Sequence, residues 1–321
     1  MPINKITSTL DVKILAIVVT HNGSRWIDRC LSSLRNSRLR PDILVVDNCS
    51  SDDTTELIRS SYPSVELIES DINLGFASAN NIGLERVITG NEYDYALLLN
   101  QDAWLADDSL FHLVATHRDV REFGIVSPIH LNGDGDLLDW NFTICISKPG
   151  NDGRRLYTDL LLKKQLQKVY KVHFVPAAAW LIHQCCLKKV GFFDHMLLPH
   201  YGEDANFTHR AKFHGFEIGV VPDSFIFHDR EDRSGQLAQS SFSIDQSLLN
   251  FKIECSNLID PDYIDKMNSL PRYHLLQAVK GILCLNFPYA RKNWSIFHKM
   301  TRLKEVIHEH RKSYQNGAEK K

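Results

Sequence analysis

The sequence predicts an α/β protein whose first half folds around a parallel sheet. Short apolar runs such as ILAIVV (residues 14–19) and DYALLL (94–99) have the length and composition of strands buried on both faces. Between such runs lie segments with apolar residues at helical spacing, as in WIDRCLSSLRNS (26–37). Strands and helices therefore alternate in the order β-α-β-α-β-α-β, which is typical of parallel strands joined by right-handed crossovers.

The remaining elements of the first half complete this alternation. DILVVDN (42–48) and VELIES (65–70) are the second and third predicted strands. A helix with Ser and Asp at its start is expected over 50–62, and the segment 73–89 is a loop that enters a helix. After residue 105 the pattern is less regular, and residues 132–155, rich in Gly, Asp and Asn, are expected to be irregular. The other expected elements are a helix over 107–118, strands over 124–131 and 172–183, two short strands within 216–227, and a mostly helical tail from residue 243.

Composition excludes several classes of protein. The chain has 321 residues, 43% of them hydrophobic and 24% charged, as in an ordinary globular protein, and its net charge of −2 gives no attraction to nucleic acid. Seven cysteines without a C-x-x-C pair argue against a structural zinc site and favour reduced thiols in the cytoplasm. The first residues lack the apolar stretch of a signal peptide, and no run of 18 apolar residues is present.

Polar residues end three of the predicted strands. Thr20 and Asn22 follow the first strand, Asp47 ends the second, and Asp102 follows the fourth in LLLNQDAW (97–104). The carboxyl ends of parallel strands meet at one edge of a sheet, where open α/β proteins bind ligands. Each residue can also be a turn residue, because Asn and Asp hydrogen-bond their own backbone. Neither a G-x-G-x-x-G nor a P-loop motif follows a strand, so a dehydrogenase or P-loop enzyme is a poor match.

Five segments stand in a fixed order in the sequence: IVVTHNG (17–23), LVVDNCSSDDT (44–54), NLGFASANNIGL (73–84), LLLNQDAW (97–104), and the stretch from VGFFDHMLLPHYGED to FIFHD (190–229). Together they resemble the inverting family 2 glycosyltransferases with the GT-A fold. The resemblance covers about residues 13–230 and is greatest to the rhamnosyl- and galactofuranosyltransferase-type members, which build bacterial surface polysaccharides such as O-antigen. It implies a Rossmann-like, mostly parallel sheet flanked by helices, the GT-A fold, to which the sequence pattern adds the mostly helical C-terminal extension.

The resemblance also implies roles for individual residues. Asp47 would accept the N3–H of uracil or thymine, since an ionised carboxylate only accepts hydrogen bonds. The metal motif of the family, usually D-x-D, reads Asn100-Gln101-Asp102 here, so one carboxylate has become a carboxamide. Asp102 and His228 are the expected ligands of Mg²⁺ or Mn²⁺, which take oxygen and, for Mn²⁺, imidazole ligands. The expected contacts to the nucleotide sugar are Thr20, Asn22, Asp47, Asn73, Gly75 and Asn100.

An acidic pair in HYGEDANFTHR (200–210) is the expected catalytic site. Asp204 is the predicted general base that takes the proton of the acceptor hydroxyl, and Glu203 is the alternative. Both residues can equally be charged residues at a helix start, where the dipole favours acids, and this role does not exclude catalysis. Ala205 and Asn206 stand where the family commonly has an apolar residue and an Asp, which leaves the acceptor geometry open.

The expected function is a metal-dependent, inverting transfer of a sugar, with rhamnose favoured, from a dTDP- or UDP-sugar to a glycan or a lipid-linked saccharide. We expect a catalytic domain over residues 1–242, with a nucleotide-binding half at about 13–105 and an acceptor half at about 106–242, and a helical region over 243–321. Two alternatives stay open. A sugar nucleotidylyltransferase should carry a basic Gly-rich loop, of which THNGSRW (20–26) is a poor version, and a non-catalytic binding module would explain the altered D-x-D motif.

The C-terminal segment 274–304 mixes apolar and basic residues. Trp294, Phe297 and Met300 recur at helical spacing beside Arg291 and Lys292. This face is expected either to pack on the catalytic domain or on a second subunit, as a homodimer, or to lie peripherally on the inner face of the cytoplasmic membrane. No nucleic-acid partner is expected.

Overall fold

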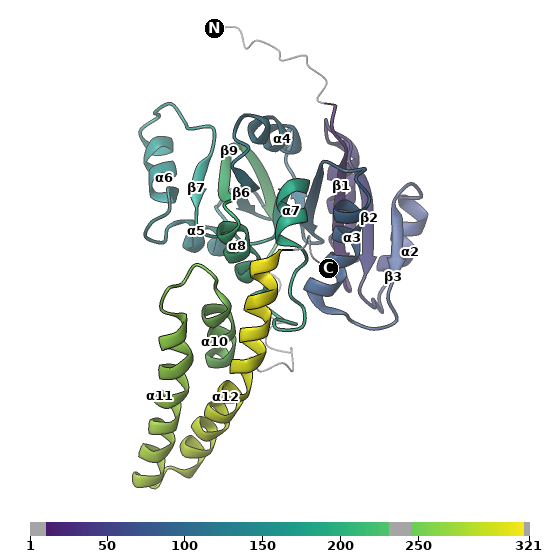
Figure 1. Ribbon diagram of the computed structural model, residues 1–321. Coiled ribbons are helices and arrows are strands. Elements are labelled where there is room, and N and C mark those ends of the chain that lie inside the picture. The colour runs from purple at the N-terminus through teal and green to yellow at the C-terminus, as the bar shows by residue number, and fades with distance from the viewer. Residues whose placement is uncertain (1–10, 231–244, 318–321) are drawn as a thin grey trace.

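The computed structural model describes residues 11–230 and 245–317, which form one nine-stranded sheet flanked by helices and a helical extension (Figure 1). The strand order is β3-β2-β1-β4-β8-β6-β9-β5, and β7 pairs with β9. The first half of the chain follows the predicted alternation. Its elements are β1 (Ile14–Thr20), α1 (Ile27–Asn36), β2 (Asp42–Asp47), α2 (Thr54–Ser61), β3 (Glu66–Glu69), α3 (Gly75–Thr89) and β4 (Tyr95–Asn100).

The four strands of the first half are parallel, and β1, β2 and β4 are mainly buried, as their apolar runs predict, whereas the edge strand β3 is partly exposed. Alternate residues of β1 enter different cores because successive side chains of a strand point to opposite faces. Leu15 and Ile17 pack in the core that contains α3, whereas Ile14, Ala16 and Val18 pack with α1 and α2. This double burial explains why β1 is apolar at nearly every position.

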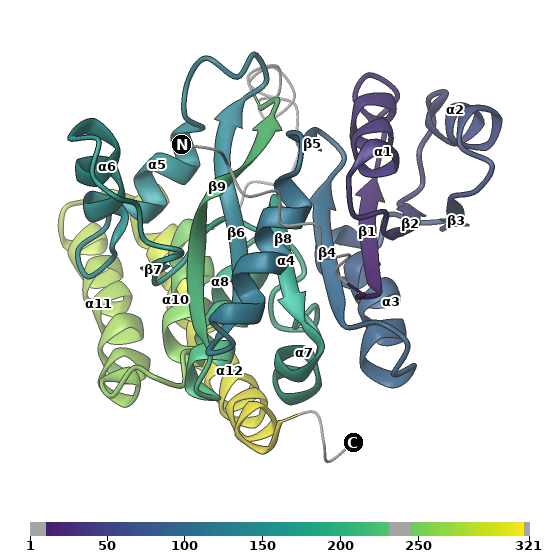
Figure 2. The ribbon, with the colours of Figure 1, turned by 90° about the horizontal axis from the view of Figure 1, so that it is seen from above.

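The second half of the sheet is mixed, which the sequence pattern did not predict. Strand β8 runs antiparallel to both of its neighbours, β4 and β6, while β6 and β9 are parallel to each other. Figure 2 shows α4 in front of the sheet and α8 behind it. The elements are β5 (Ala103–Leu105), α4 (Ser109–Asp119), β6 (Phe123–Asn132), α5 (Trp140–Ile146), α6 (Gly153–Leu161), β7 (Tyr170–Val172), β8 (Ala179–His183), α7 (Gln184–Val190), α8 (Glu203–Phe213) and β9 (Glu217–His228).

Two local predictions in this half are wrong. The segment expected to be irregular contains α5 and α6, and α5 begins where the Asp139 carboxylate accepts a hydrogen bond from the Phe142 amide (2.8 Å). The two short strands expected within 216–227 are one strand, β9. Its register against β6 shifts after Val221, next to Pro222, because proline has no N–H to donate to the ladder.

The helical extension consists of α10 (Gln246–Ser256), α11 (Tyr263–Leu283) and α12 (Phe287–Asn316), which share a core with the segment around Leu197. The predicted helical tail is confirmed from residue 245, and the predicted boundary at residue 242 lies outside the described residues. Met300 is buried in this core, whereas Trp294 is about half exposed. The expected face of Trp294, Phe297 and Met300 is therefore not one exposed surface. Within the described ranges, no helix is long and apolar enough to cross a membrane.

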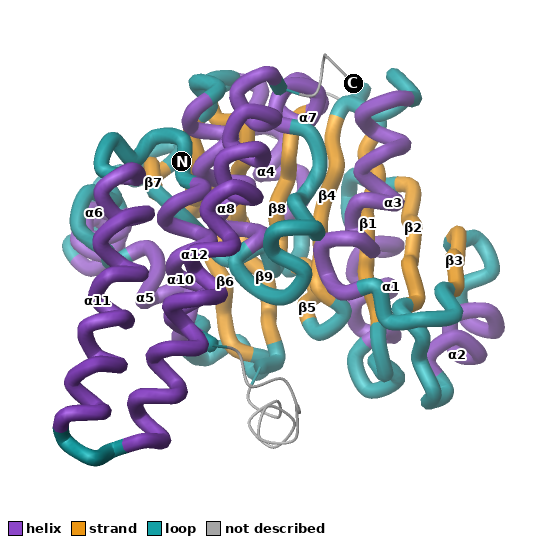
Figure 3. The backbone as a smooth tube through the Cα atoms, turned by 60° about the horizontal axis from the view of Figure 1, so that its bottom comes forward, coloured by secondary structure: helices purple, strands orange, loops and turns teal. Residues whose placement is uncertain are grey.

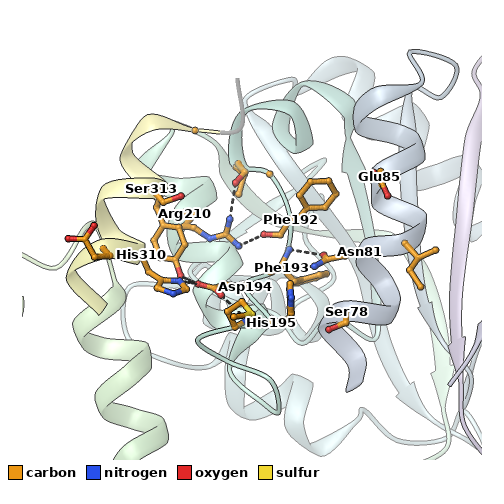
Figure 4. Close-up of a pocket in the computed structure, with 17 residues that line it drawn as sticks. Ser78, Asn81, Glu85, Phe192, Phe193, Asp194, His195, Arg210, His310 and Ser313 are labelled. Carbon is orange, nitrogen blue, oxygen red and sulfur yellow. Dashed lines mark hydrogen bonds and ion pairs between the residues drawn. The ribbon is translucent and has the colours of Figure 1, made fainter. Parts of the chain in front are cut away.

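The end of α12 returns to the α/β unit and is held there by a polar network (Figure 4). The Asp194 carboxylate accepts hydrogen bonds from Tyr314 and His310 of α12 and from the Leu197 amide. Arg210 of α8 donates to the carbonyls of Val190 (2.8 Å) and Phe192 (2.7 Å), and its guanidinium lies over the Tyr314 ring. These contacts line a cavity of about 680 Å³ between α3, α8 and α12.

Asp194 carries much of this attachment electrostatically. Burial raises the pKa of Asp194, but hydrogen bonds from His310, the Leu197 amide and Tyr314 outweigh burial and lower that pKa to about 2. A carboxylate whose pKa is lowered by folding stabilises the folded state above its ordinary pKa near 4. That stabilisation is lost as the pH falls toward 2.

We therefore expect Asp194→Asn to lower the free energy of unfolding at pH 7 by on the order of 2 kcal/mol. The difference from the wild type should shrink between pH 4 and pH 2, because protonation removes the same charge. Urea unfolding at several pH values measures both effects. The control is Asp119→Asn, which alters an exposed ion pair with Lys168 and should change stability little. A difference for Asp194→Asn that does not vary with pH would contradict the assignment.

Candidate active site

A cavity of about 730 Å³ lies at the carboxyl edge of the parallel strands. The ends of β1, β2 and β4 reach it through His21, Asn48 and Asn100, as the strand-end argument predicts. The beginnings of α3 and α8 and the segment before β8 complete the walls. The polar lining residues are His21, Asn48, Asn73, Asn100, Gln101, Asn141, His200, Tyr201, Glu203, Asp204 and Arg230.

The Gln101 side chain joins the ends of β1 and β4 through hydrogen bonds. Its Oε1 accepts hydrogen bonds from the Thr20 hydroxyl (2.6 Å) and the His21 amide (2.9 Å), and its Nε2 donates to the His21 carbonyl (3.2 Å). Thr20 is fully buried and does not line the cavity, so its expected ligand contact stays a prediction. The middle residue of the Asn-Gln-Asp triplet thus shapes the cavity floor, a role that the sequence analysis missed.

The Asp47 carboxylate stabilises a turn through one oxygen, and its other oxygen makes no hydrogen bond within the described residues. Its Oδ2 accepts a hydrogen bond from the Ser50 amide (2.9 Å), which is the turn expected as the structural alternative. Its Oδ1 is buried and has no hydrogen-bond partner among the described residues. Such a buried acceptor is costly unless a ligand satisfies it. Asp47 lies behind the cavity wall, next to Asn48, which lines it.

Asn73 and Gly75 form the start of α3 and line the cavity. Asn48 donates to the Asn73 side chain (2.9 Å) and accepts from the Leu74 amide (2.6 Å), so the strand end holds the helix start. Gly75 has a φ of +78°, and a Cβ there would lie 2.9 Å from the Pro199 carbonyl oxygen. The close approach that requires glycine is therefore made by the chain itself, at the segment that leads to α8.

Asn22 takes part in the loop after β1 and does not line the cavity. Its side-chain oxygen accepts from the Ser51 amide (2.8 Å), and its φ of 49° is a left-handed conformation that Asn tolerates. These contacts join the loop after β1 to the loop after β2. The expected contact of Asn22 with the nucleotide stays a prediction.

Asp102 and His228 lie together although 126 positions separate them in the sequence, and neither lines the cavity, which their neighbours Gln101 and Arg230 do. Pairing of β5 with β9 brings them close, and His228 Nε2 is 3.5 Å from Asp102 Oδ1. Both side chains are buried. In the described part of the chain, no group of three or more His, Cys, Asp or Glu side chains is arranged to hold a metal ion. Any ion at this pair therefore needs further ligands from a substrate or water.

On its Nδ1 side, His228 contacts Asp139 and Arg230, two residues that the sequence analysis did not single out. Its Nδ1 lies 3.5 Å from Asp139 Oδ2 and accepts a hydrogen bond from Arg230 Nε (3.1 Å). Burial raises the pKa of Asp139, but His228, the Phe142 amide and the charge of Arg230 lower it to about 2. Asp139 lies in the segment expected to be irregular, so no periodicity marked it. Its only signal in the sequence was an acid before a short apolar run.

Glu203 and Asp204 begin α8 and are the carboxylates among the described residues that line the cavity. Burial, together with the negative charge of Asp204, raises the pKa of Glu203 to about 8. Burial also raises the pKa of Asp204, but hydrogen bonds from backbone amides, among them that of Ala205 (2.7 Å), oppose the rise. Burial therefore favours retention of protons by both carboxyl groups, and a pKa of about 8 keeps Glu203 largely protonated at neutral pH.

The similarity of this chain to known proteins agrees with that geometry. The family model described as "Glycosyl transferase family 2" matches residues 15–191, which is more than half of the chain. The chain belongs to glycosyl transferase family 2. As a glycosyltransferase, it is neither a nucleotidylyltransferase nor a binding module without activity, the two alternatives left open by the sequence. The matched range contains the ends of β1, β2 and β4 but not Glu203, Asp204 or His228.

Two curated glycosyltransferases share low identity with the chain over most of their length. Glycosyltransferase AglE of Haloferax volcanii is 25% identical over 248 residues, which are 74% of this chain and 73% of that protein. The N-acetylglucosaminyl-diphospho-decaprenol L-rhamnosyltransferase of Mycobacterium tuberculosis is 22% identical, over 68% of this chain and 77% of that protein.

Solved glycosyltransferases share the fold of this family 2 chain. The structure of S. aureus TarS 1-349 has a TM-score of 0.51 at 14% identity and covers 90% of this chain and 92% of that one. GalNAc-T7 with UDP, GalNAc and Mn²⁺ has a TM-score of 0.53 at 16% identity, covering 68% of this chain and 43% of that one. At such identities the similarity concerns the fold alone, and it confirms the predicted GT-A-like fold.

The proton on Glu203 leads to a prediction about stability. A carboxyl group whose pKa is raised by folding favours the folded state at low pH. This contribution is lost as the pH rises from about 4.5, the ordinary value, through about 8. We expect the free energy of unfolding of the wild type to fall relative to that of Glu203→Gln between pH 5 and pH 9. The difference can reach about 5 kcal/mol.

Chemical denaturation at a series of pH values measures this difference. The control is Glu305→Gln on an exposed part of α12, which should run parallel to the wild type at every pH. If Glu203→Gln also runs parallel to the wild type, Glu203 does not hold a proton at neutral pH in the folded protein.

Proposed function

We propose that this glycosyltransferase is a metal-dependent, inverting enzyme that moves a sugar from a dTDP- or UDP-sugar to a glycan or lipid-linked saccharide of a bacterial surface polysaccharide. The observation that carries the proposal is the acidic pair in the cavity. Both carboxyl groups line the cavity, and burial raises the pKa of each, which makes each carboxylate a stronger proton acceptor once it is ionised. A single positioned base is what an inverting transfer needs, since one proton leaves the acceptor as the new bond forms.

The reaction is a direct displacement within the cavity. Asp204 takes the proton of the acceptor hydroxyl while the hydroxyl oxygen forms a bond to the anomeric carbon of the donor sugar. The bond from that carbon to the diphosphate oxygen breaks on the opposite face, so the configuration inverts. Arg230, on the cavity wall, gives positive charge on the side of the departing diphosphate, and the α3 start at Gly75 favours anions through the helix dipole.

The donor base is assigned to Asp47. Its unused Oδ1 can accept the N3–H of either uracil or thymine, because both bases present this donor. Asn73 and Asn100 line the cavity between that end and the acidic pair, where the ribose and the sugar must lie. Thr20 and Asn22 support the same wall. Rhamnose as the sugar, and a lipid-linked acceptor, draw support from the printed name of the mycobacterial relative.

The metal is assigned to Asp102 and His228. Their facing atoms, Asp102 Oδ1 and His228 Nε2, are 3.5 Å apart. A ligand role needs the Nε2 lone pair, so with an ion bound the ring proton would lie on Nδ1, toward the Asp139 carboxylate at 3.5 Å, and Nδ1 would no longer accept from Arg230. Two ligand atoms about 2.1 Å from one ion lie about 3 to 3.5 Å apart, so the spacing is compatible with Mg²⁺ or Mn²⁺. When bound, the ion supplies positive charge that stabilises the departing diphosphate. The one imidazole ligand favours Mn²⁺.

A screen of nucleotide sugars tests the donor assignment. In the presence of Mn²⁺, a bound dTDP- or UDP-sugar should raise the melting temperature by mass action, and GDP- or ADP-sugars should not. Release of the free nucleoside diphosphate with a saccharide acceptor then measures transfer. A rise with purine donors only would refute the assignment of the base to Asp47.

Asp204→Asn should lower kcat by about 10²- to 10⁴-fold and leave the Kd of the donor almost unchanged. The substitution keeps the shape of the side chain and removes its ability to accept a proton. Glu203→Gln is the matched variant, and because Glu203 is already protonated at neutral pH, its loss of kcat should be smaller. A larger loss in Glu203→Gln than in Asp204→Asn would reverse the two roles.

Asp102→Ala should abolish Mn²⁺-dependent binding of UDP or dTDP and with it the transfer reaction. Asn100→Asp should keep or tighten metal binding, since it restores a second carboxylate to the triplet. Titration calorimetry of each variant with Mn²⁺ and nucleotide measures both. Asp108→Ala, an acid outside the cavity, is the control, and unaltered activity in a folded Asp102→Ala protein would remove the metal role of Asp102.

A further inference from the structure

The hairpin of α11 and α12 ends in an exposed apolar turn. We call residues 279–289 the hairpin tip. Leu283 and Leu285 are 79% and 76% exposed, and Phe287 is 61% exposed. Figures 1 and 3 show the tip at the end of the hairpin that points away from the sheet. Soluble proteins rarely present so many apolar side chains together unless the surface binds something.

The tip is built to hold these side chains in place. The Asn286 amide donates to the Gly281 carbonyl (2.8 Å) and the Leu285 amide donates to the Ile282 carbonyl (3.0 Å), which together close the end of α11. The Asn286 side chain then accepts from the Tyr289 amide (3.2 Å) and begins α12. Gly281 faces the Ala290 backbone so closely that a Cβ would lie 2.9 Å from the Ala290 nitrogen. The apolar side chains therefore extend from a tightly packed turn.

Leu285 occupies a position of this turn at which a residue other than glycine is unusual. It has a φ of 55°, at the position after a helix where glycine is normally found. A leucine in this conformation costs free energy, and its exposed side chain contributes little packing in return. Stability of the chain alone would favour glycine here. A residue that lowers stability without a packing gain points to a role outside the fold.

The charge of the hairpin identifies the chemistry of what it meets. Residues 266–304 contain eight Lys or Arg and no Asp or Glu, although the whole chain has a net charge of −2. Lys280 within the tip, and Arg291 and Lys292 just after it, are exposed. An apolar tip surrounded by cations is complementary to a surface with apolar chains below an anionic layer.

We propose that the hairpin tip inserts into the headgroup region of an anionic lipid bilayer and docks the enzyme on the membrane. Leu283, Leu285 and Phe287 enter the boundary of the acyl chains, while Lys280, Arg291 and Lys292 bind the lipid phosphates. The network of Asp194, Arg210 and Tyr314 fastens α12 to α8, so the docked hairpin holds the α/β unit at a set orientation. This docking needs neither donor nor acceptor, so it is independent of the proposed function.

Vesicle co-sedimentation with the full chain tests the proposal. The wild type should bind vesicles that contain phosphatidylglycerol, and bind vesicles of pure phosphatidylcholine much more weakly. Leu285→Gly should lower the partition coefficient about tenfold, as the loss of one inserted leucine implies. Its melting temperature should equal or exceed that of the wild type, because glycine suits the left-handed conformation.

Two further variants distinguish insertion of the hairpin tip from nonspecific adsorption to vesicles. Leu161→Ser removes an equally exposed leucine from the end of α6 and should leave vesicle binding unchanged. The triple variant Lys280→Gln, Arg291→Gln and Lys292→Gln should lose most binding to anionic vesicles while its melting temperature changes little.

Other outcomes would overturn the proposal. Equal vesicle binding by the wild type and Leu285→Gly would exclude insertion of the tip. If the wild type binds no vesicles, and light scattering shows a dimer that Leu283→Ser with Leu285→Gly converts to a monomer, the tip is an interface between two copies. Failure of docking with intact sugar transfer in solution would leave the proposed function unaffected.

Discussion

The parallel pairing of β1 with both β2 and β4 is the constraint on which the rest of the site depends. In this register Thr20 lies opposite Asp47 and Val19 lies opposite Asn100, so three strand ends stop at one edge. The register is hard to shift, because moving β1 by one residue would exchange its two buried faces between unequal cores. Gln101 then closes the edge by bonding to Thr20 and the His21 backbone. Backbone pairing of the strands thus brings polar residues to one edge of the sheet, where they form the floor of the cavity.

The helical extension shapes the catalytic half of the cavity from behind. Gly202, just before the acidic pair, has a φ of +86°, and a Cβ there would lie 2.6 Å from the Ile253 side chain of α10. The close packing of α10 therefore leaves room only for glycine at the turn that begins α8, directly before the buried Glu203. Burial in turn keeps a proton on Glu203. The turn that carries the acidic pair is thus packed against a helix that lies more than forty residues later in the chain.

Helix α8 connects the active site to the C-terminal hairpin. Its first residues are the acidic pair, and two turns later Arg210 joins the carbonyls of Val190 and Phe192 to the Tyr314 ring. Asn206, which departs from the family pattern, accepts from Arg210 (2.9 Å) and donates to Ser256 of α10 (3.1 Å). A carboxylate at Asn206 could not donate that second bond. The departure is thus explained by the packing of the extension, in which an amide serves better than an acid.

The sequence by itself determined the parallel half of the sheet, its polar strand ends and the enzyme family, because these depend on local patterns. Apolar runs, helical spacing and short motifs such as LLLNQDAW are read from neighbouring residues, and they predicted where the cavity lies. Only the tertiary structure decided the antiparallel β8, the contact of Asp139 and Arg230 with His228, and the burial that raises the pKa of both Glu203 and Asp204. It also decided that Met300 is buried while Leu285 is exposed. Each of these features follows from contacts between segments that are far apart in the chain. The burial and the pKa of a side chain depend on all the residues that surround it in the folded protein, so a local sequence pattern does not predict them.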